Sequence, residues 1–571
     1  MWFGNLVTCD WWEYVWLNEG FAEYFQWHIA DIFRPSYKFD QLFVVHKLQP
    51  TLVLDSLSSS HPVNNPVINN TNIAQIFDGI AYGKAASLIR MLRNSLPVGL
   101  FDKALQKYLD KYKYSSVTPS DLWSVLDEVI EEHGVIEGLN DPIEKLMDSW
   151  INKAGYPIVH VTYTSEYIRF FQRRFTTNGQ ILSSDYKVPI TVTLSRNMDF
   201  ENTTAIFWLG SATTHLPINL SKSFFIVNSQ QTGFYRVHYD MYNWNRIVDF
   251  LHSPNYTEIH VSNRAQIIDD LLSFARSGHV EYDFALNATR YLFVEKEYPP
   301  WKAFFNHMEY LLHFYEEQPN YARLRKYLER VMGHSYQRSS ISIVAGETHA
   351  EKLISEVIMQ LASRIEYRDL EIKSRKLFDT WLKTGTNLIL SNARPAVYCL
   401  VMKRATREQW DFLYDQYLRT DFGTEKEIII EALGCSKNYM ILSRYASMAL
   451  NKNYTAGFRK HDVPKIFASI YNSGQYGTIS FVDYLLNNYD KVYDYYGNWH
   501  DVADLFTKVA ARLCTGKHID KLQNFVNENP SELIEMLPVL QSAVTAAKRN
   551  NKWYKNYSPD IDSWILKNLE N

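Results

Sequence analysis

Glu19 is the residue whose surroundings point most directly to chemistry. It stands in the run Trp16-Leu17-Asn18-Glu19-Gly20-Phe21-Ala22, directly after the aromatic stretch Trp11-Trp12-Glu13-Tyr14-Val15. From Leu17 onward apolar residues recur at spacings of three and four, which predicts a helix with Glu19 in its first turn. A carboxylate held among aromatic side chains needs a cation, a metal ion or a raised pKa. The alternative is ordinary helix-start electrostatics, in which an acidic side chain complements the helix dipole.

A second candidate lies in the stretch Phe77-Asp78-Gly79-Ile80-Ala81-Tyr82-Gly83-Lys84-Ala85. The apolar spacing that follows predicts a helix with Tyr82 near its start. In a chain with 39 tyrosines, a tyrosine at such a position is ordinarily a packing residue. Lys84 is interpreted as a solvated or salt-bridged helix residue and not as a catalytic one.

Together with Trp2-Phe3-Gly4-Asn5-Leu6-Val7-Thr8, these stretches resemble the segments that follow the H-E-x-x-H helix in the gluzincin zinc aminopeptidases, the aminopeptidase N branch in particular. In that family two histidines and a glutamate from the next helix bind zinc. The resemblance implies that Glu19 is this third zinc ligand. It also implies that Tyr82 is the transition-state stabiliser, whose neutral hydroxyl hydrogen-bonds the oxyanion. Ala85 replaces the family's glycine after the lysine, and Gln26 stands where many relatives carry glutamate.

The same resemblance implies that this chain lacks the N-terminal domain and the H-E-x-x-H helix. The family's second histidine would fall immediately before Met1, and no two of the 17 histidines are four residues apart. Catalytic zinc needs three protein ligands. The intact enzyme is therefore expected to be a zinc metallo-aminopeptidase, while this chain alone is expected neither to hold zinc nor to be active. Trp11, Trp12 and Trp16, which would pack against the missing helix, are expected to leave an exposed apolar patch.

The periodicity of the apolar residues predicts a mainly α-helical protein. The chain is also expected to form several domains, because 571 residues are too many for one core. Residues 1–157 are helical, and by the resemblance they form the C-terminal part of a thermolysin-like catalytic domain. Residues 158–242 show period-two apolar runs that predict a small antiparallel β-sandwich. Residues 243–571 contain helices with short connections, which favour an α-helical solenoid-like domain.

The local predictions within these regions are specific. Amphipathic helices are expected at 40–54, 80–94, 101–112 and 120–132. Strands are expected at 159–163, 188–194, 205–209 and 224–227. The polar loop 58–66 is expected to run over the surface beside the cleft.

The amino-acid composition limits the classes of partner that the chain is expected to bind. A net charge of −4 offers no basic surface for nucleic acid, so the expected partner is a peptide substrate, as the resemblance implies. No secretory signal and no apolar run of eighteen residues is present, so no membrane anchor is encoded here, although a longer chain could carry one. The resemblance implies an extracellular or cell-surface location. Seven glycosylation acceptors favour a secretory protein: Asn69, Asn202, Asn219, Asn255, Asn287, Asn453 and Asn556.

Four cysteines are too few for a disulfide scaffold. By the resemblance, Cys399 and Cys435 match the spacing of a disulfide in the helical domain. Two other functions stay open at this point. One is a non-catalytic receptor or binding module that uses the sandwich and the helical domain. The other is a helical interaction protein unrelated to peptidases, which does not account for the zinc-helix resemblance.

Overall fold

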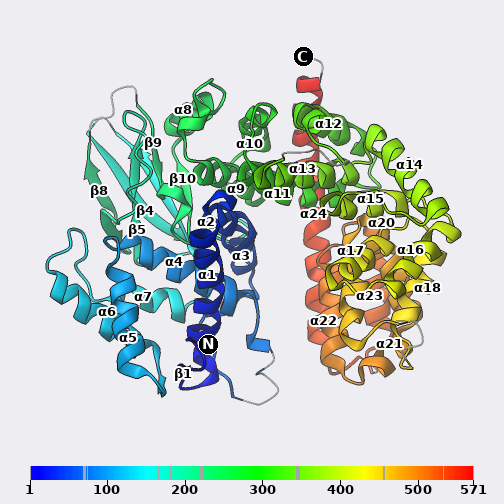
Figure 1. Cartoon of the computed structure of the whole chain (residues 1–571), viewed down its shortest axis with the longest axis horizontal. Helices are drawn as coiled ribbons and strands as arrows, with labels where there is room; N and C mark the ends of the chain where they lie inside the picture. Colours follow the sequence, from blue (N-terminus) through cyan, green and yellow to red (C-terminus); the bar gives the residue numbers. More distant parts are fainter. Residues whose placement is uncertain are drawn as a thin grey trace. The chain divides into compact units, whose positions relative to one another are not determined.

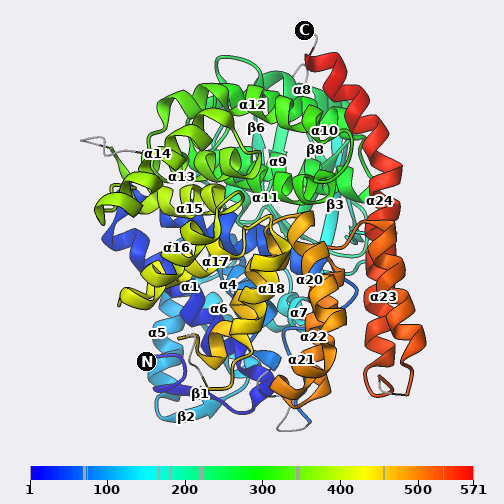
Figure 2. The same cartoon turned by 90° about the vertical axis from the view of Figure 1, so that its right-hand side faces the viewer.

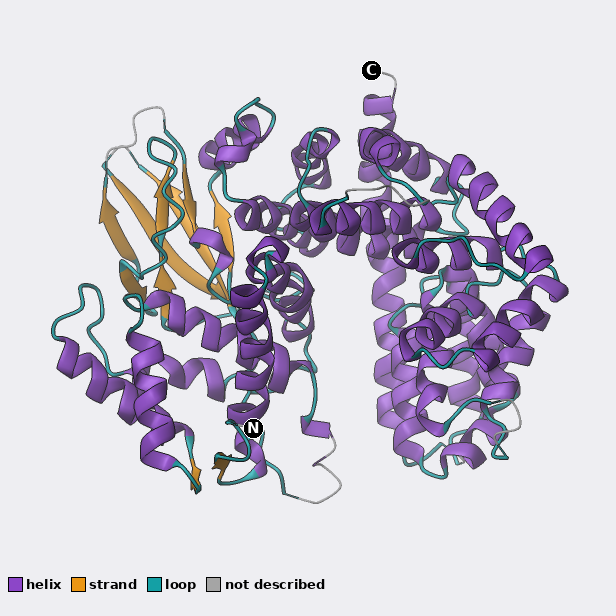
Figure 3. Ribbon diagram, in the orientation of Figure 1, coloured by secondary structure: helices purple, strands orange, loops and turns teal. Residues whose placement is uncertain are grey.

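The structure, a computed structural model, is mainly helical with a small region of strands (Figure 3). It describes residues 2–68, 73, 75–164, 166–180, 182–218, 223–341, 347–453, 457–531 and 533–569. The chain divides into two compact units. The first consists of Met1–Tyr291 and Pro299–Phe304, and the second of Leu292–Tyr298 and Phe305–Asn571. The finer division at residues 157 and 242 stays a prediction.

The first unit opens with the helical region that the apolar periodicity predicts (Figure 1). Helix α1, Trp16–Phe33, buries Trp16, Leu17 and Phe21 on one side. The predicted helix at 40–54 is interrupted by a π-helical turn, and the predicted helix at 80–94 begins with another. The segments after α1 are α2 (Phe39–Phe43), the π-helical turn η3 (Val44–Leu48), α3 (Gln49–Asp55), the π-helical turn η5 (Ile80–Lys84), α4 (Ala85–Ser95), α5 (Leu100–Tyr112), α6 (Pro119–His133) and α7 (Ile143–Asn152).

The strands of the first unit form four small sheets. They are β1 (Val7–Cys9), β2 (Ser115–Val117), β3 (Pro157–Tyr163), β4 (Tyr167–Arg174), β5 (Val188–Ile190), β6 (Val192–Leu194), β7 (Phe207–Leu209), β8 (Thr214–Pro217), β9 (Phe225–Val227) and β10 (Arg236–Tyr239). The largest sheet has the order β10-β3-β4-β8. The expectation of purely antiparallel pairing was wrong, because β10 pairs with β3 in parallel. This pairing is open to β10 because a long stretch of chain separates it from β3.

A buried arginine joins this sheet to the helix that follows it. Arg236 on β10 is fully buried. Its Nη1 lies 2.6 Å from Asp269 Oδ2 and 2.8 Å from Asp270 Oδ1, both on α9 (Val261–Ser277). Its Nε donates to the Tyr156 hydroxyl at 3.2 Å. One side chain therefore holds together strand β10, helix α9 and the segment that leads into β3.

Replacement of Arg236 by methionine is expected to destabilise the first unit strongly. Asp269 and Asp270 would lose the guanidinium that compensates their burial, and breaking a buried ion pair costs about 3–5 kcal/mol. Urea unfolding followed by circular dichroism measures the loss, and hydrogen exchange locates it in β10 and α9. Arg169→Met, at an exposed position of β4, is the matched control. Equal unfolding midpoints for the two variants would contradict the role given to Arg236.

Helices continue from α8 to the end of the described chain, as the absence of period-two runs after Tyr242 predicts. They are α8 (Met241–Leu251), α9, α10 (Tyr282–Ala288), α11 (Tyr298–Tyr315), α12 (Tyr321–Arg338), α13 (His349–Arg364), α14 (Arg368–Thr384), α15 (Arg394–Met402), α16 (Arg407–Arg419), α17 (Gly423–Leu433), α18 (Tyr439–Ala449), α19 (Val463–Asn472), α20 (Gln475–Asn487), α21 (Tyr489–Tyr496), α22 (Trp499–Ala510), α23 (Gly516–Glu528) and α24 (Leu537–Leu569).

Within the second unit the helices α13, α15, α17 and α19 pack in sequence order, whereas the last helix, α24, contacts α12 as well as α22 and α23 (Figure 2). Helix α15 contacts α13 and α17, and α17 in turn contacts α19. Cys399 on α15 is bonded to Cys435, just beyond α17, with an S–S distance of 2.11 Å. The bond therefore ties two neighbouring helices together. Within the described residues, none of the helices has the length and apolarity that a membrane crossing requires.

The predicted glycosylation acceptors differ in accessibility. Asn202, Asn255, Asn453 and Asn556 are exposed, and Asn287 is half-buried. Asn69 and Asn219 lie outside the described residues. Attachment of a glycan needs an accessible asparagine, and four positions meet that requirement plainly.

Candidate active site

Glu19 lies in the first turn of α1, as predicted, and is half-buried. Helix α1 packs against both η5 and α4. The approach to α4 is close, because a Cβ on Gly20 would lie 2.5 Å from the Cβ of Ala85. Glycine at position 20 therefore accommodates the alanine that stands in place of the family's glycine. It also sets the carboxylate of Glu19 against the turn that carries Tyr82.

Tyr82 lies in the π-helical turn η5, and its side chain is partly buried. The ring packs against an apolar cluster formed by Val15, Val67, Ile76 and Ala81. It also lies beside the ring of Phe77, with 6.5 Å between the centroids. The ring of Tyr82 is therefore held by packing and its backbone by the helical turn. Only its hydroxyl group is available for polar contacts.

The structure brings the two predicted site residues together. Burial, and after it a side-chain hydrogen bond with Glu19, raises the pKa of Tyr82 to about 12. A phenol with this pKa stays protonated at neutral pH, so the hydroxyl donates and the carboxylate accepts. The pair combines an acceptor of metal-ligand type with a neutral hydrogen-bond donor.

Glu23 is a further acidic residue near this pair that the sequence analysis did not single out. One helical turn after Glu19, its Oε1 lies 2.8 Å from Lys47 Nζ and accepts a hydrogen bond from Trp27 Nε1 at 3.0 Å. Burial alone would raise its pKa, but the bonds from Lys47 and Trp27 hold it below the ordinary value. The spacing of four from Glu19 on one helix face was the signal that could have found it.

Lys84 is a salt-bridged residue, one of the two interpretations that its sequence context allowed. Its Nζ is fully buried, 2.9 Å from Asp55 Oδ2, and donates to the carbonyls of Lys153 and Gly155 at 3.1 and 3.0 Å. Burial lowers its pKa, and the neighbouring Asp55 opposes that effect. Every donor of the ammonium group is thus engaged in joining η5 to α3 and to the end of the helical region. This supports a structural role.

The aromatic side chains before α1 divide into two groups. Trp16 is only 1% exposed and donates from Nε1 to Asn64 Oδ1 at 2.7 Å. Trp11 and Trp12 are 52% and 38% exposed, and Trp2 is 60% exposed. The expected exposure is therefore found for Trp11 and Trp12, whereas the expectation was wrong for Trp16, which belongs to the core.

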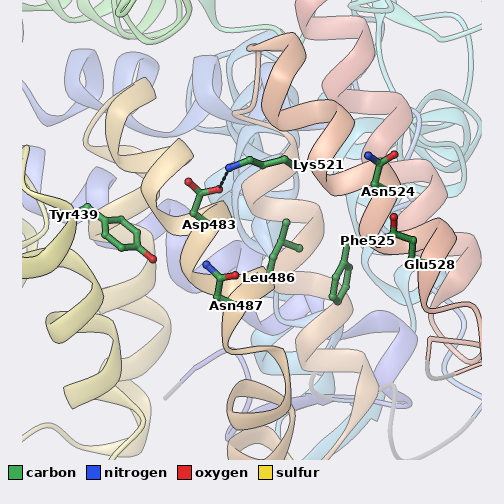
Figure 4. A pocket seen from close by; sticks show the side chains of 8 residues that line it. All are labelled: Tyr439, Asp483, Leu486, Asn487, Lys521, Asn524, Phe525 and Glu528. Atoms are coloured by element: carbon green, nitrogen blue, oxygen red, sulfur yellow. Dashed lines mark hydrogen bonds and ion pairs between the residues drawn. The ribbon is translucent and has the colours of Figure 1, made fainter.

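The second unit has a separate pocket of about 610 Å³ between helices α18, α20 and α23 (Figure 4). Asp483 and Lys521 on its wall form an ion pair of 2.8 Å. Neither a histidine nor a cysteine is among its lining residues, which are Tyr439, Asp483, Leu486, Asn487, Lys521, Asn524, Phe525 and Glu528. This composition suits the recognition of polar groups.

The described residues do not contain a complete metal site. Nowhere in the described ranges do three or more histidine, cysteine, aspartate or glutamate side chains gather in a way that could hold an ion. Glu19 can supply one oxygen ligand of the kind zinc accepts. Any zinc bound at Glu19 would need its other ligands from residues outside these ranges.

Comparison with known proteins matches two regions of the chain to described families. The family described as "Peptidase family M1 domain" matches residues 1–150, and the "ERAP1-like C-terminal domain" matches residues 224–548. Thyrotropin-releasing hormone-degrading ectoenzyme of Rattus norvegicus is 34% identical over 79% of this chain and 44% of that protein. Aminopeptidase N of Rattus norvegicus is 30% identical over 99% of this chain and 59% of that protein. Aminopeptidase N of Homo sapiens is 29% identical over the same two shares.

These matches define the class of protein to which the chain belongs. The chain is a member of the M1 family of metallo-aminopeptidases. It spans about half to three-fifths of the length of the relatives that it matches.

Proposed function

We propose that this chain is part of a zinc-dependent aminopeptidase that hydrolyses the N-terminal residue from peptides. Glu19 serves as the third zinc ligand, and the two histidine ligands come from residues outside this sequence. Tyr82 serves as the transition-state stabiliser. One observation carries the proposal: helix α1 packs closely on η5 and α4 at Gly20 and Ala85, and this packing sets the Glu19 carboxylate near Tyr82, whose pKa it raises. Without the two histidines, the 571 residues alone hold no catalytic zinc and are inactive.

The surroundings of Glu19 suit a metal ligand. The carboxylate is half-buried, and among the ion pairs of the described residues none joins it to lysine, arginine or histidine. Its position against η5 is fixed by Gly20 and Ala85. A half-buried carboxylate without a cationic partner is favourable for binding a metal ion. Zinc, when bound, would supply Lewis-acid chemistry at the scissile carbonyl.

Tyr82 suits its role because it can donate without becoming charged. A pKa of about 12 keeps the hydroxyl protonated throughout the neutral range. As negative charge develops on the carbonyl oxygen of the substrate, a hydrogen bond from this hydroxyl strengthens. The ring packing on Phe77 and the apolar cluster fixes the donor before the substrate arrives. The hydroxyl would then donate to the oxyanion.

The remaining parts fit this function. We assign residues 1–157 to the C-terminal half of a thermolysin-like catalytic domain, residues 158–242 to a β-sandwich and residues 243–571 to a helical solenoid. The succession of contacts from α13 through α15 and α17 to α19 supports the last assignment. The partner is a peptide and not a nucleic acid. The location is the cell surface, in keeping with the exposed glycosylation acceptors at Asn202, Asn255, Asn453 and Asn556.

Zinc content and aminopeptidase activity test the proposal. Both are measured on the 571-residue chain and on a chain extended upstream along its reading frame, with alanine and leucine p-nitroanilides as substrates. One zinc per chain and activity in the extended form alone are expected. An extended chain that binds no zinc and cleaves neither substrate would overturn the proposal in favour of a non-catalytic binding protein.

A further inference from the structure

Asp78 holds the turn that carries Tyr82. Its Oδ1 accepts hydrogen bonds from the backbone N–H groups of Ile80 at 2.9 Å and Ala81 at 3.1 Å. Its carbonyl oxygen accepts from the N–H of Tyr82 at 3.1 Å. Three successive backbone N–H groups at the start of η5 therefore donate hydrogen bonds to one residue, Asp78. Because the first N–H groups of a helix have no acceptor within it, this contact fixes where the turn begins.

His61 in turn holds the carboxylate of Asp78. The Nε2 of His61 lies 2.7 Å from Asp78 Oδ2, and its Nδ1 lies 2.7 Å from the carbonyl oxygen of Pro62. A carbonyl and a carboxylate both accept, so a protonated imidazole, with hydrogen on both ring nitrogens, satisfies the two contacts together. The bond to Asp78 raises the pKa of His61, and burial opposes it; the negative charge of Asp55 adds a smaller increase. Burial is the largest single effect on Asp78 and raises its pKa, but the contact with His61 and the hydrogen bonds from the Ala81 and Ile80 N–H groups together lower the pKa below its ordinary value.

The loop that carries His61 is itself anchored to two helices. Asn64 accepts from Trp16 Nε1 at the start of α1. The backbone N–H of Asn64 donates to the Ile151 carbonyl at 2.8 Å, and its Nδ2 donates to Asn152 Oδ1 at 2.7 Å, both at the end of α7. The predicted surface loop 58–66 is therefore tied down three residues after His61. The anchored loop holds the imidazole of His61 in place, and the imidazole in turn positions the carboxylate of Asp78.

We propose that His61 and Asp78 are positioning residues for Tyr82, which place the phenol hydroxyl where the oxyanion of the substrate develops. The inference rests on the proposed function of Tyr82 and extends it to two residues that do not touch the substrate. Ring packing on Phe77 orients the side chain of Tyr82, whereas the His61–Asp78 contact fixes the backbone from which that side chain projects. Misplacement of a donor by about 1 Å costs up to about 100-fold in rate.

A double-mutant cycle in the extended chain tests the pathway through Tyr82. His61→Gln is expected to lower kcat about tenfold with little change in KM, because the donor is displaced while substrate contacts remain. In the Tyr82→Phe background the same substitution is expected to have almost no effect. His133→Gln, an exposed histidine at the end of α6, is the matched control. An equal loss in both backgrounds, or no loss in either, would overturn the proposal.

Hydrogen exchange of the 571-residue chain gives an answer that does not depend on activity. In His61→Gln the amides of Ile80 and Ala81 are expected to exchange about tenfold faster, because their acceptor is no longer held. Amides of α5 should keep their wild-type rates. Unchanged exchange at 80–81 would refute the positioning role even if the extended enzyme proves active. Faster exchange there with an inactive extended wild type would retain the structural part and reject the proposed function.

Discussion

Replacement of Glu19 by glutamine in the extended chain is expected to remove zinc and, with it, activity. An amide oxygen is a neutral and weaker ligand than a carboxylate, so the charge that compensates the metal ion is lost. Loss of a group that merely supports a ligand costs about 10–100-fold in affinity or activity. Loss of the ligand itself is therefore expected to exceed about 100-fold in both. The bound zinc is measured by mass spectrometry after dialysis, beside the rate with the p-nitroanilide substrates.

A control variant distinguishes a loss of zinc binding from a loss of folding stability. Glu131→Gln removes an exposed carboxylate from α6 and is expected to retain zinc, activity and unfolding midpoint. Glu19→Gln is expected to share that midpoint in the zinc-free state, because Glu19 forms no ion pair among those of the described residues. A Glu19→Gln chain that keeps full zinc and full activity would remove Glu19 from the metal site.

The sequence predicted the helices well because each is specified locally. The amphipathic stretches 101–112 and 120–132 correspond to α5 and α6 with boundaries that differ by a residue or so. The π-helical turns inside the stretches 40–54 and 80–94 were not predicted, since a one-residue widening of a helix leaves the apolar pattern almost unchanged. Local pattern thus fixed the presence of an element better than its exact geometry.

Strand β4 shows why the sheet was harder to predict. Ile168, Phe170 and Gln172 point inward, but the third of these is polar and hides the alternation. The structure compensates Gln172 with hydrogen bonds from its Nε2 to the carbonyls of Tyr186 and Gly210, at 2.6 and 2.7 Å. Both partners lie far along the chain. A polar residue can be predicted to be buried only when its hydrogen-bonding partners are known. The sequence alone did not identify the partners of Gln172.

The candidate site depended on the same kind of long-range information. Periodicity placed Glu19 in a first turn and Tyr82 near a helix start, but it gave no reason for the two to meet. Their proximity depends on the close packing of Gly20 against Ala85, a tertiary contact. Only the resemblance to a family connected them in advance. Glu23 and the His61–Asp78 contact, which no quoted motif singled out as functional, became visible through the structure.

Tyr82→Phe in the extended chain is expected to lower kcat by about 100- to 1,000-fold, the range seen when one oxyanion donor is removed. KM should change little, since the hydroxyl acts on charge that develops only in the transition state. Zinc content should be unchanged, because the substitution leaves the Glu19 carboxylate in place. Folding should also be unchanged, because phenylalanine keeps the ring contacts with Phe77 and the apolar cluster. Steady-state kinetics and zinc analysis measure these quantities together.

A second tyrosine variant tests whether the loss of kcat is specific to Tyr82. Tyr114→Phe removes a hydroxyl from a side chain that is 86% exposed and should leave kcat as it is. The pH profile adds a further constraint. Since the pKa of Tyr82 is raised to about 12, the wild-type rate should show no loss from ionisation of this phenol below about pH 11. A Tyr82→Phe enzyme within a factor of about three of the wild type would mean that the oxyanion is stabilised elsewhere.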